Sequence, residues 1–167
     1  MILDYLNIFA GWPSQAVVII VSMLPIAELR VGLPLALTAY SLPIWQAFLL
    51  AIFGNLLPVW FILKYIGPIS SWLSKRSKLF EKFFNWLFER TRRKLNGHYE
   101  IYGLWALTLF VAIPLPVTGA WTGAVAAWLF NLPIKKSFLA ICLGVMIASG
   151  VVFLATTGTV KFLNWIV

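Results

Sequence analysis

Charge is scarce in this chain. Only 11% of its 167 residues are Asp, Glu, Lys or Arg, whereas an ordinary soluble domain has about 25%. Apolar residues make up 62% and the mean hydropathy is +0.92, so most of the surface has to face lipid rather than water. We therefore expect an all-α integral membrane protein that folds as a single membrane domain over residues 1–167.

Cysteine and histidine are nearly absent, and so are the motifs of enzymes. Cys142 is the sole cysteine, which excludes an intrachain disulfide, and we interpret it as a small core residue of an apolar run. His98 is the sole histidine and is expected to be a solvated side chain beside a basic segment. The sequence has no nucleophile elbow, no zinc-protease motif and no P-loop. We expect no enzyme activity, no metal and no cofactor.

Positive charge is concentrated in one segment. The net charge is +8, and residues 67–100 hold eight of the 13 Lys and Arg residues. Apolar residues recur there at helical spacing, which predicts a basic amphipathic helix on the membrane surface. This pattern favours a cytoplasmic face that anchors the topology or attracts anionic lipid, rather than nucleic-acid binding. We expect a prokaryotic cytoplasmic (inner) membrane protein with this segment in the cytoplasm.

The N-terminus lacks the positive start of a signal peptide, because no Lys or Arg precedes Arg30. We expect the first residues to be retained as a short interfacial helix ended by Pro13.

Two apolar segments, 44–66 and 137–160, reach the roughly 20 residues that a transmembrane helix needs. Segments 14–42 and 102–130 instead pair short apolar arms around proline-rich centres. Eleven helical residues cover about 16 Å, roughly half of a ~30 Å hydrocarbon core. We therefore expect each pair of arms to be a re-entrant hairpin, which enters and leaves the membrane on one side.

The two halves of the chain repeat. At an offset of 90, Ser41–Ile44 matches Asn131–Ile134 and Gly54 matches Gly144, and at 91 Pro25 matches Pro116 and Gly32 matches Gly123. A hairpin does not cross the membrane and a span crosses once, so repeat 1 (1–66) and repeat 2 (101–160) should be inverted, as in secondary transporters. Lys135 and Lys136 join the cytoplasmic charge only if the second hairpin is re-entrant. The small buried interior of each half favours a homodimer.

The charged stretch Leu24–Pro34 is the expected centre, because ionisable residues at membrane depth are expensive and mark functional sites. Either Glu28 and Arg30 pair to permit their burial, or Glu28 takes up protons while Arg30 binds an anion. Half-helices starting after each loop would present N-termini to an anion, with Pro34 in a first turn and Thr118 as a cap. The expected substrate- or ion-binding residues are Glu28, Arg30, Gly32, Pro34, Asn55, Pro114, Pro116, Thr118, Gly119 and Thr122. For Asn55 a helix–helix hydrogen bond is the alternative.

The motif Glu28-x-Arg30-x-Gly32-Leu33-Pro34-x-Ala36, with Pro114-x-Pro116-x-Thr118-Gly119, resembles the small multidrug export protein family over nearly the whole chain. That family in turn resembles the DedA/VTT superfamily, which has two opposed re-entrant hairpins with charged residues at their loops. The resemblance implies lipid movement, since members of the superfamily are implicated in moving lipids such as the polyprenyl phosphate of cell-wall synthesis. The second hairpin here departs from that pattern, with no arginine or acid between Ile101 and Ile134.

We predict a transporter that moves an anionic amphipathic substrate, a lipid phosphate, between two opposed re-entrant loops. The alternatives are a proton-coupled exporter of lipophilic cations that uses Glu28, and a scaffold without transport activity. An accessible Glu28 would favour cation export, Glu28 paired with Arg30 would favour an anion, and a scaffold should lack a cavity at the loops. The expected partners are anionic membrane lipids, protons or another coupling ion, and a second copy of the chain.

Overall fold

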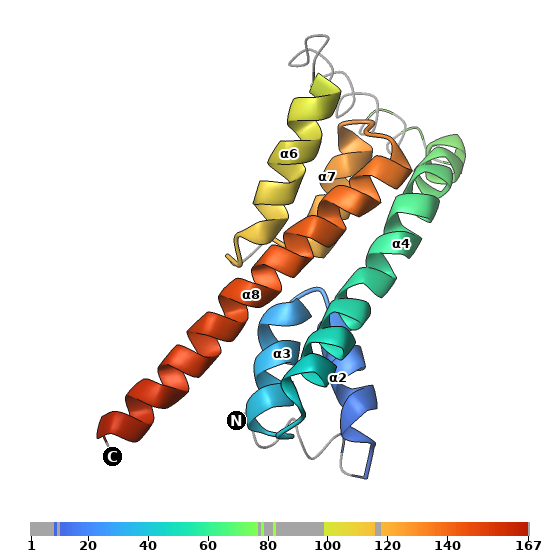
Figure 1. Ribbon diagram of the computed structural model, residues 1–167. Coiled ribbons are helices and arrows are strands. Elements are labelled where there is room, and N and C mark those ends of the chain that lie inside the picture. The colour runs from blue at the N-terminus through green and yellow to red at the C-terminus, as the bar shows by residue number, and fades with distance from the viewer. Residues whose placement is uncertain are drawn as a thin grey trace. The chain divides into compact units, whose positions relative to one another are not determined.

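The computed structural model describes residues 9, 11–76, 78, 82, 99–115 and 118–166. The regular elements of this part of the chain are all α-helices (Figure 1). They are α2 (Ser14–Met23), α3 (Glu28–Thr38), α4 (Ile44–Arg76), α6 (Tyr99–Ala112), α7 (Ala120–Leu129) and α8 (Ile134–Ile166). The predicted interfacial helix, most of the basic segment beyond Arg76, and Pro116 lie outside the described residues.

Helices α4 and α8 each contain 33 residues, which corresponds to a length of about 50 Å. Both are long and apolar enough to cross a membrane. Large apolar side chains stand on their surfaces, with Leu49, Phe53, Leu139 and Leu154 each 58–70% exposed. An apolar surface of this extent is typical of contact with lipid.

The first long helix does not end at Gly67-Pro68, so the predicted boundary at residue 66 is wrong. Both Pro58 and Pro68 lie inside α4. A proline removes one backbone donor from a helix, and in apolar surroundings hydroxyl side chains can support the affected turn. The carbonyl that loses its donor to Pro68 is that of Lys64, whereas the hydroxyls of Ser70 and Ser71 donate to the Gly67 carbonyl oxygen at 2.8 and 3.0 Å.

The chain forms two compact units, and each long helix contributes one part to each of them. Unit 1 comprises Met1–Asn55 and Ser149–Val167, and so contains α2, α3, the first part of α4 and the second part of α8. Unit 2 comprises Leu56–Ala148, with the rest of α4, α6, α7 and the first part of α8. A single membrane domain stays a prediction.

The core of unit 1 is built by close helix contact. A Cβ on Gly32 of α3 would overlap the Ser22 hydroxyl of α2, and a Cβ on Gly54 of α4 would lie 2.9 Å from the Ser22 Cβ. Small residues at such positions let helix backbones approach. Val17, Val18, Leu29, Leu33 and Ala36 complete the buried apolar core around these contacts.

The core of unit 2 is built in the same way. A Cβ on Gly123 of α7 would lie 2.6 Å from Val111 Cγ2 of α6, and a Cβ on Gly144 of α8 would lie 2.8 Å from the Thr108 carbonyl oxygen. The hydroxyl of Thr108 also donates to the Ala140 carbonyl oxygen of α8 at 3.1 Å. Helices α6, α7 and α8 are therefore joined through small residues and one interhelical hydrogen bond.

Equivalent positions of the two repeats share local structure. Ser41 and Asn131, 90 residues apart, both have a left-handed backbone, with φ of 49° and 52°. The next helix begins in each case with a bond to a proline carbonyl, from Ala47 N to Pro43 O at 3.0 Å and from Ser137 N to Pro133 O at 2.9 Å. The inversion of the repeats and the re-entrant path of the hairpins stay predictions.

Candidate functional site

Glu28 begins α3, directly after the turn that follows α2. Its backbone N–H donates to the Leu24 carbonyl oxygen at 2.9 Å, and its φ is 47°. A left-handed backbone costs a non-glycine residue about 1–3 kcal/mol, and such strain gathers at functional sites. The Glu28 side chain is nevertheless only 8% exposed, so a strained turn places a carboxylate in the interior of unit 1.

Arg30 is the charged partner of this carboxylate. Its Nη2 lies 3.9 Å from Oε2 of Glu28, and its side chain is 25% exposed. Both residues belong to α3, so the charge pair does not lie on extended backbone. Residues two apart do not face each other on a regular helix, but the left-handed Glu28 departs from that geometry.

The N-terminus of α3 carries its own carboxylate. The helix starts at Glu28 and not near Pro34, so Pro34 is its seventh residue and the first-turn prediction is wrong. A helix N-terminus stabilises negative charge, and here Glu28 takes that position. The helix dipole therefore stabilises the Glu28 carboxylate, which takes the place that a bound anion would need at this N-terminus.

Pro34 changes the hydrogen bonding of the helix at the charged turn. It has no N–H to donate to the carbonyl of Arg30, as the fourth residue along a helix otherwise does. Its own carbonyl accepts the hydroxyl of Thr38 at 2.8 Å. The turn that carries the guanidinium thus also carries a carbonyl deprived of its usual helical donor.

Two buried polar side chains of unit 1 have atoms without a partner in the described part of the chain. They are Asn55, through Oδ1, and Ser22, through its hydroxyl. The alternative for Asn55, a helix–helix hydrogen bond, stays a prediction. Ser22 was missed from the sequence, although the spacing of Gly32 and Gly54 could have indicated a tightly packed neighbour on α2.

The second loop is held together by Thr118. Its hydroxyl lies 2.8 Å from the Ile113 carbonyl oxygen and 2.9 Å from that of Leu115, and the N–H of Leu115 donates to it at 3.2 Å. The prediction that Thr118 caps the next helix is wrong, because the N-cap of α7 is Gly119 and no side chain caps it. The hydroxyl of Thr122 donates to the Gly119 carbonyl oxygen at 3.2 Å.

The two hairpins differ in charge. Glu28, Arg30, Gly32, Pro34 and Asn55 belong to unit 1. Pro114, Thr118, Gly119 and Thr122 belong to unit 2, where the sequence from 102 to 134 has no acidic or basic residue. At the offset of 91, Gly119 stands where the first repeat has Glu28. The charge pair is thus a feature of the first repeat.

Comparison with known protein families gives a match that covers most of the chain. The family model described as "Putative small multi-drug export protein" matches residues 28–151. The matched span begins at Glu28, the first residue of α3, and includes α3, α4, α6, α7 and the loop before α7. Neither the curated proteins nor the solved structures gave a match.

Proposed function

The chain belongs to the small multi-drug export protein family, and on that premise we propose a transporter whose substrate is an anionic amphipathic molecule, a lipid phosphate. Family membership and the two long apolar helices support a membrane transporter. We propose that transport proceeds without covalent chemistry.

The observation that carries the proposal is the exposure of the two charges in α3. Glu28 is buried and lies 3.9 Å from Arg30, whose side chain is three times as exposed, 25% against 8%. A cation exporter needs an accessible negatively charged side chain, whereas an anion transporter needs an accessible positively charged one. The arrangement presents the guanidinium and holds the carboxylate behind it, which favours an anion.

The chemistry of arginine favours phosphate in particular. A guanidinium is a planar donor fork that binds phosphate through two parallel hydrogen bonds. At 3.9 Å the contact with Glu28 exceeds hydrogen-bond length, so the fork of Arg30 is not saturated by that carboxylate. A phosphate bound there would compete with Glu28 for Arg30.

This competition suggests a coupling ion. A phosphate that takes the place of Glu28 at Arg30 would leave the carboxylate without its cationic neighbour. Proton uptake at Glu28 on substrate binding, and its release afterwards, would couple the two movements. We therefore propose the proton as the coupling partner.

The surroundings of the site complete the proposal. We propose that the protein lies in a prokaryotic cytoplasmic membrane as a homodimer. Its two hairpins are proposed to be re-entrant and inverted, with the segment after Arg76 in the cytoplasm. The recurring glycine contacts and left-handed turns at matching positions support the repeat on which this arrangement depends.

The family description favours a second candidate, export of lipophilic cations. In that case Glu28 would have to be exposed on leaving Arg30, and would then counter-charge the cation and exchange it for protons.

The two candidates are separated by transport in proteoliposomes that hold the full-length protein. A fluorescent phosphatidic acid serves as the lipid phosphate and ethidium as the lipophilic cation, each measured with and without a proton gradient. We expect the phosphatidic acid to be moved faster than in protein-free vesicles and ethidium not to be. Movement of ethidium alone would replace the anion proposal by the cation candidate, and movement of neither would favour the scaffold.

A further inference from the structure

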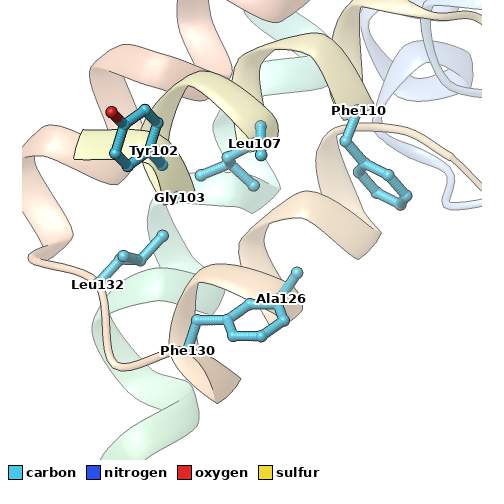
Figure 2. A pocket seen from close by; sticks show the side chains of 8 residues that line it. Tyr102, Gly103, Leu107, Phe110, Ala126, Phe130 and Leu132 are labelled. Carbon is cyan, nitrogen blue, oxygen red and sulfur yellow. The ribbon is translucent and has the colours of Figure 1, made fainter. Parts of the chain in front are cut away.

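A cavity of about 440 Å³ lies between α6 and α7 of unit 2, within the roughly 300–1,000 Å³ of ligand pockets. Its lining residues are Tyr102, Gly103, Ala106, Leu107, Phe110, Ala126, Phe130 and Leu132, and we call it the α6/α7 groove. Figure 2 shows Tyr102 and Leu132 together at one edge of the view and Phe110 at the other. None of these residues belongs to the proposed transport site.

The first repeat closes the equivalent surface. Ile19 and Ser22 of α2 lie against Gly54, and Thr108 and Val111 of α6 lie against the matching Gly144. These contacts align α2 with α6 at an offset of 89. At that offset Phe110 corresponds to Val21, and the two side chains are 38% and 9% exposed. The second hairpin therefore leaves open a surface that the first one buries.

The chemistry of the lining decides between water and a hydrocarbon. Apart from the phenol of Tyr102, the lining side chains are apolar, and apolar cavities do not hold ordered water. One turn of an α-helix, about 10 Å across and 5.4 Å long, already fills roughly 420 Å³. The groove is therefore too small for a docked helix of several turns but can hold an extended hydrocarbon chain.

Positive charge at one end of unit 2 favours a lipid with an anionic headgroup. Lys135 and Lys136 follow the lining residue Leu132 by three and four positions and are exposed. Three residues of chain reach at most about 11 Å. Figure 1 shows the start of α6, the start of α8 and the end of α4 at the same end of unit 2, and exposed Lys75 and Arg76 close α4 there. Tyr102 lies at this end as well, as aromatic residues at a membrane–water interface do.

We propose that the α6/α7 groove holds one acyl chain of an anionic phospholipid, whose headgroup lies against Lys135 and Lys136. This lipid is a resident ligand of unit 2 and not the transported substrate. Binding in the groove requires neither Glu28 nor Arg30, so it goes beyond the proposed transport and can hold or fail independently of it.

Native mass spectrometry of the detergent-solubilised full-length protein tests the groove. The probes are phosphatidylglycerol and phosphatidylcholine with identical acyl chains, titrated separately. Ala106→Phe fills the groove from α6 and Ala126→Leu fills it less drastically from α7. The matched control is Leu109→Phe, because Leu109 lies on α6, is 60% exposed and does not line the groove.

We expect wild type and Leu109→Phe to bind phosphatidylglycerol in preference to phosphatidylcholine, and the two filling variants to lose at least tenfold of that affinity at unchanged thermal stability. Lys135→Gln should weaken phosphatidylglycerol roughly fivefold, the effect of one lysine near an anionic surface, and should leave phosphatidylcholine unchanged.

Three results would overturn the proposal. The first is equal phosphatidylglycerol binding by Ala126→Leu and Leu109→Phe, which would show that the lipid binds outside the groove. The second is a change from dimer to monomer in Ala106→Phe with lipid binding intact, which would assign the groove to a second copy. The third is a wild type that binds the two lipids equally. Transport of phosphatidic acid is measured separately, so loss of transport with groove binding intact counts only against the proposed function.

Discussion

The carbonyl oxygen of Ile19 lies 2.6 Å from the position that a Cβ on Gly54 would take. In the other unit, the carbonyl oxygen of Thr108 lies 2.8 Å from the corresponding position on Gly144. A backbone oxygen cannot turn away as a flexible side chain can. In each unit, the first short helix thus packs directly on the backbone of a long helix.

Gly54→Ala and Gly144→Ala should each destabilise the protein. Overpacking of a tight core costs about 1–3 kcal/mol, and relief here requires the helices to separate. The measurement is the thermal unfolding midpoint of the purified protein in one detergent.

The matched control for both substitutions is Gly150→Ala, since nothing lies within 4 Å of a Cβ at that position. Alanine is the better helix former by roughly 1 kcal/mol, so the control should be neutral or slightly more stable. If Gly54→Ala unfolded at the same temperature as Gly150→Ala, the close contact of α2 with α4 would be wrong.

Ser22 and Gly32 should be energetically coupled, because the Ser22 hydroxyl occupies the space that a Cβ on Gly32 would need. Gly32→Ala alone should destabilise the protein. Ser22→Ala alone should cost little, because it removes a buried hydroxyl with no partner in the described residues. In the double variant the cost of Gly32→Ala should fall, with a coupling energy of about 0.5–3 kcal/mol expected for residues in contact.

The double-mutant cycle is measured by thermal unfolding of the four proteins. Strictly additive effects would show that the α2–α3 contact does not run through this pair.

Single cysteines at Arg76 and Lys136 should label from the same side of the membrane, in a Cys142→Ala background that keeps labelling specific. Both positions are exposed in unit 2, and re-entry of the second hairpin returns the chain to the side from which it entered. The measurement is labelling by a membrane-impermeant maleimide in intact cells and in inside-out vesicles. Labelling from opposite sides would make residues 102–130 cross the membrane and would rule out re-entry.

Some of the fold follows from apolar length alone. The long helices α4 and α8 and the short α2, α6 and α7 lie where apolar runs predict them, because run length and helix breakers are local properties. The repeat paired Gly54 with Gly144 and Gly32 with Gly123, but it did not indicate what packs against these glycines. Only the packing of the helices in the structure shows that Ser22 and Thr108 contact these glycines.

Other features depend on backbone geometry that the sequence does not encode locally. The start of α3 at Glu28 rests on a left-handed residue that is not glycine, and this conformation is rare enough that no residue pattern predicts it. The first apolar segment was expected to end at residue 66, yet α4 continues through Pro68 to Arg76. Thr118 was interpreted as a cap, but its hydroxyl bonds within the loop before α7.

The central claim is that Arg30 binds the phosphate of the substrate while Glu28 carries the coupling proton. Glu28→Gln keeps the shape of the side chain but cannot take up a proton in exchange. Arg30→Lys keeps the charge but loses the planar donor fork that matches phosphate. Removing Arg30 outright would leave the buried Glu28 carboxylate uncompensated, which typically costs about 3–5 kcal/mol, so Arg30→Lys is the more informative change at that position.

The most direct test is the initial rate of phosphatidic acid transport in proteoliposomes by wild type, Glu28→Gln and Arg30→Lys, at matched amounts of protein with matched thermal stability. We predict that Arg30→Lys needs at least tenfold more substrate for half-maximal rate. We predict that Glu28→Gln binds the substrate at least as tightly as wild type but does not move it against a gradient. Wild-type rates and gradients in both stable variants would contradict the account and rule out this turn as the working site.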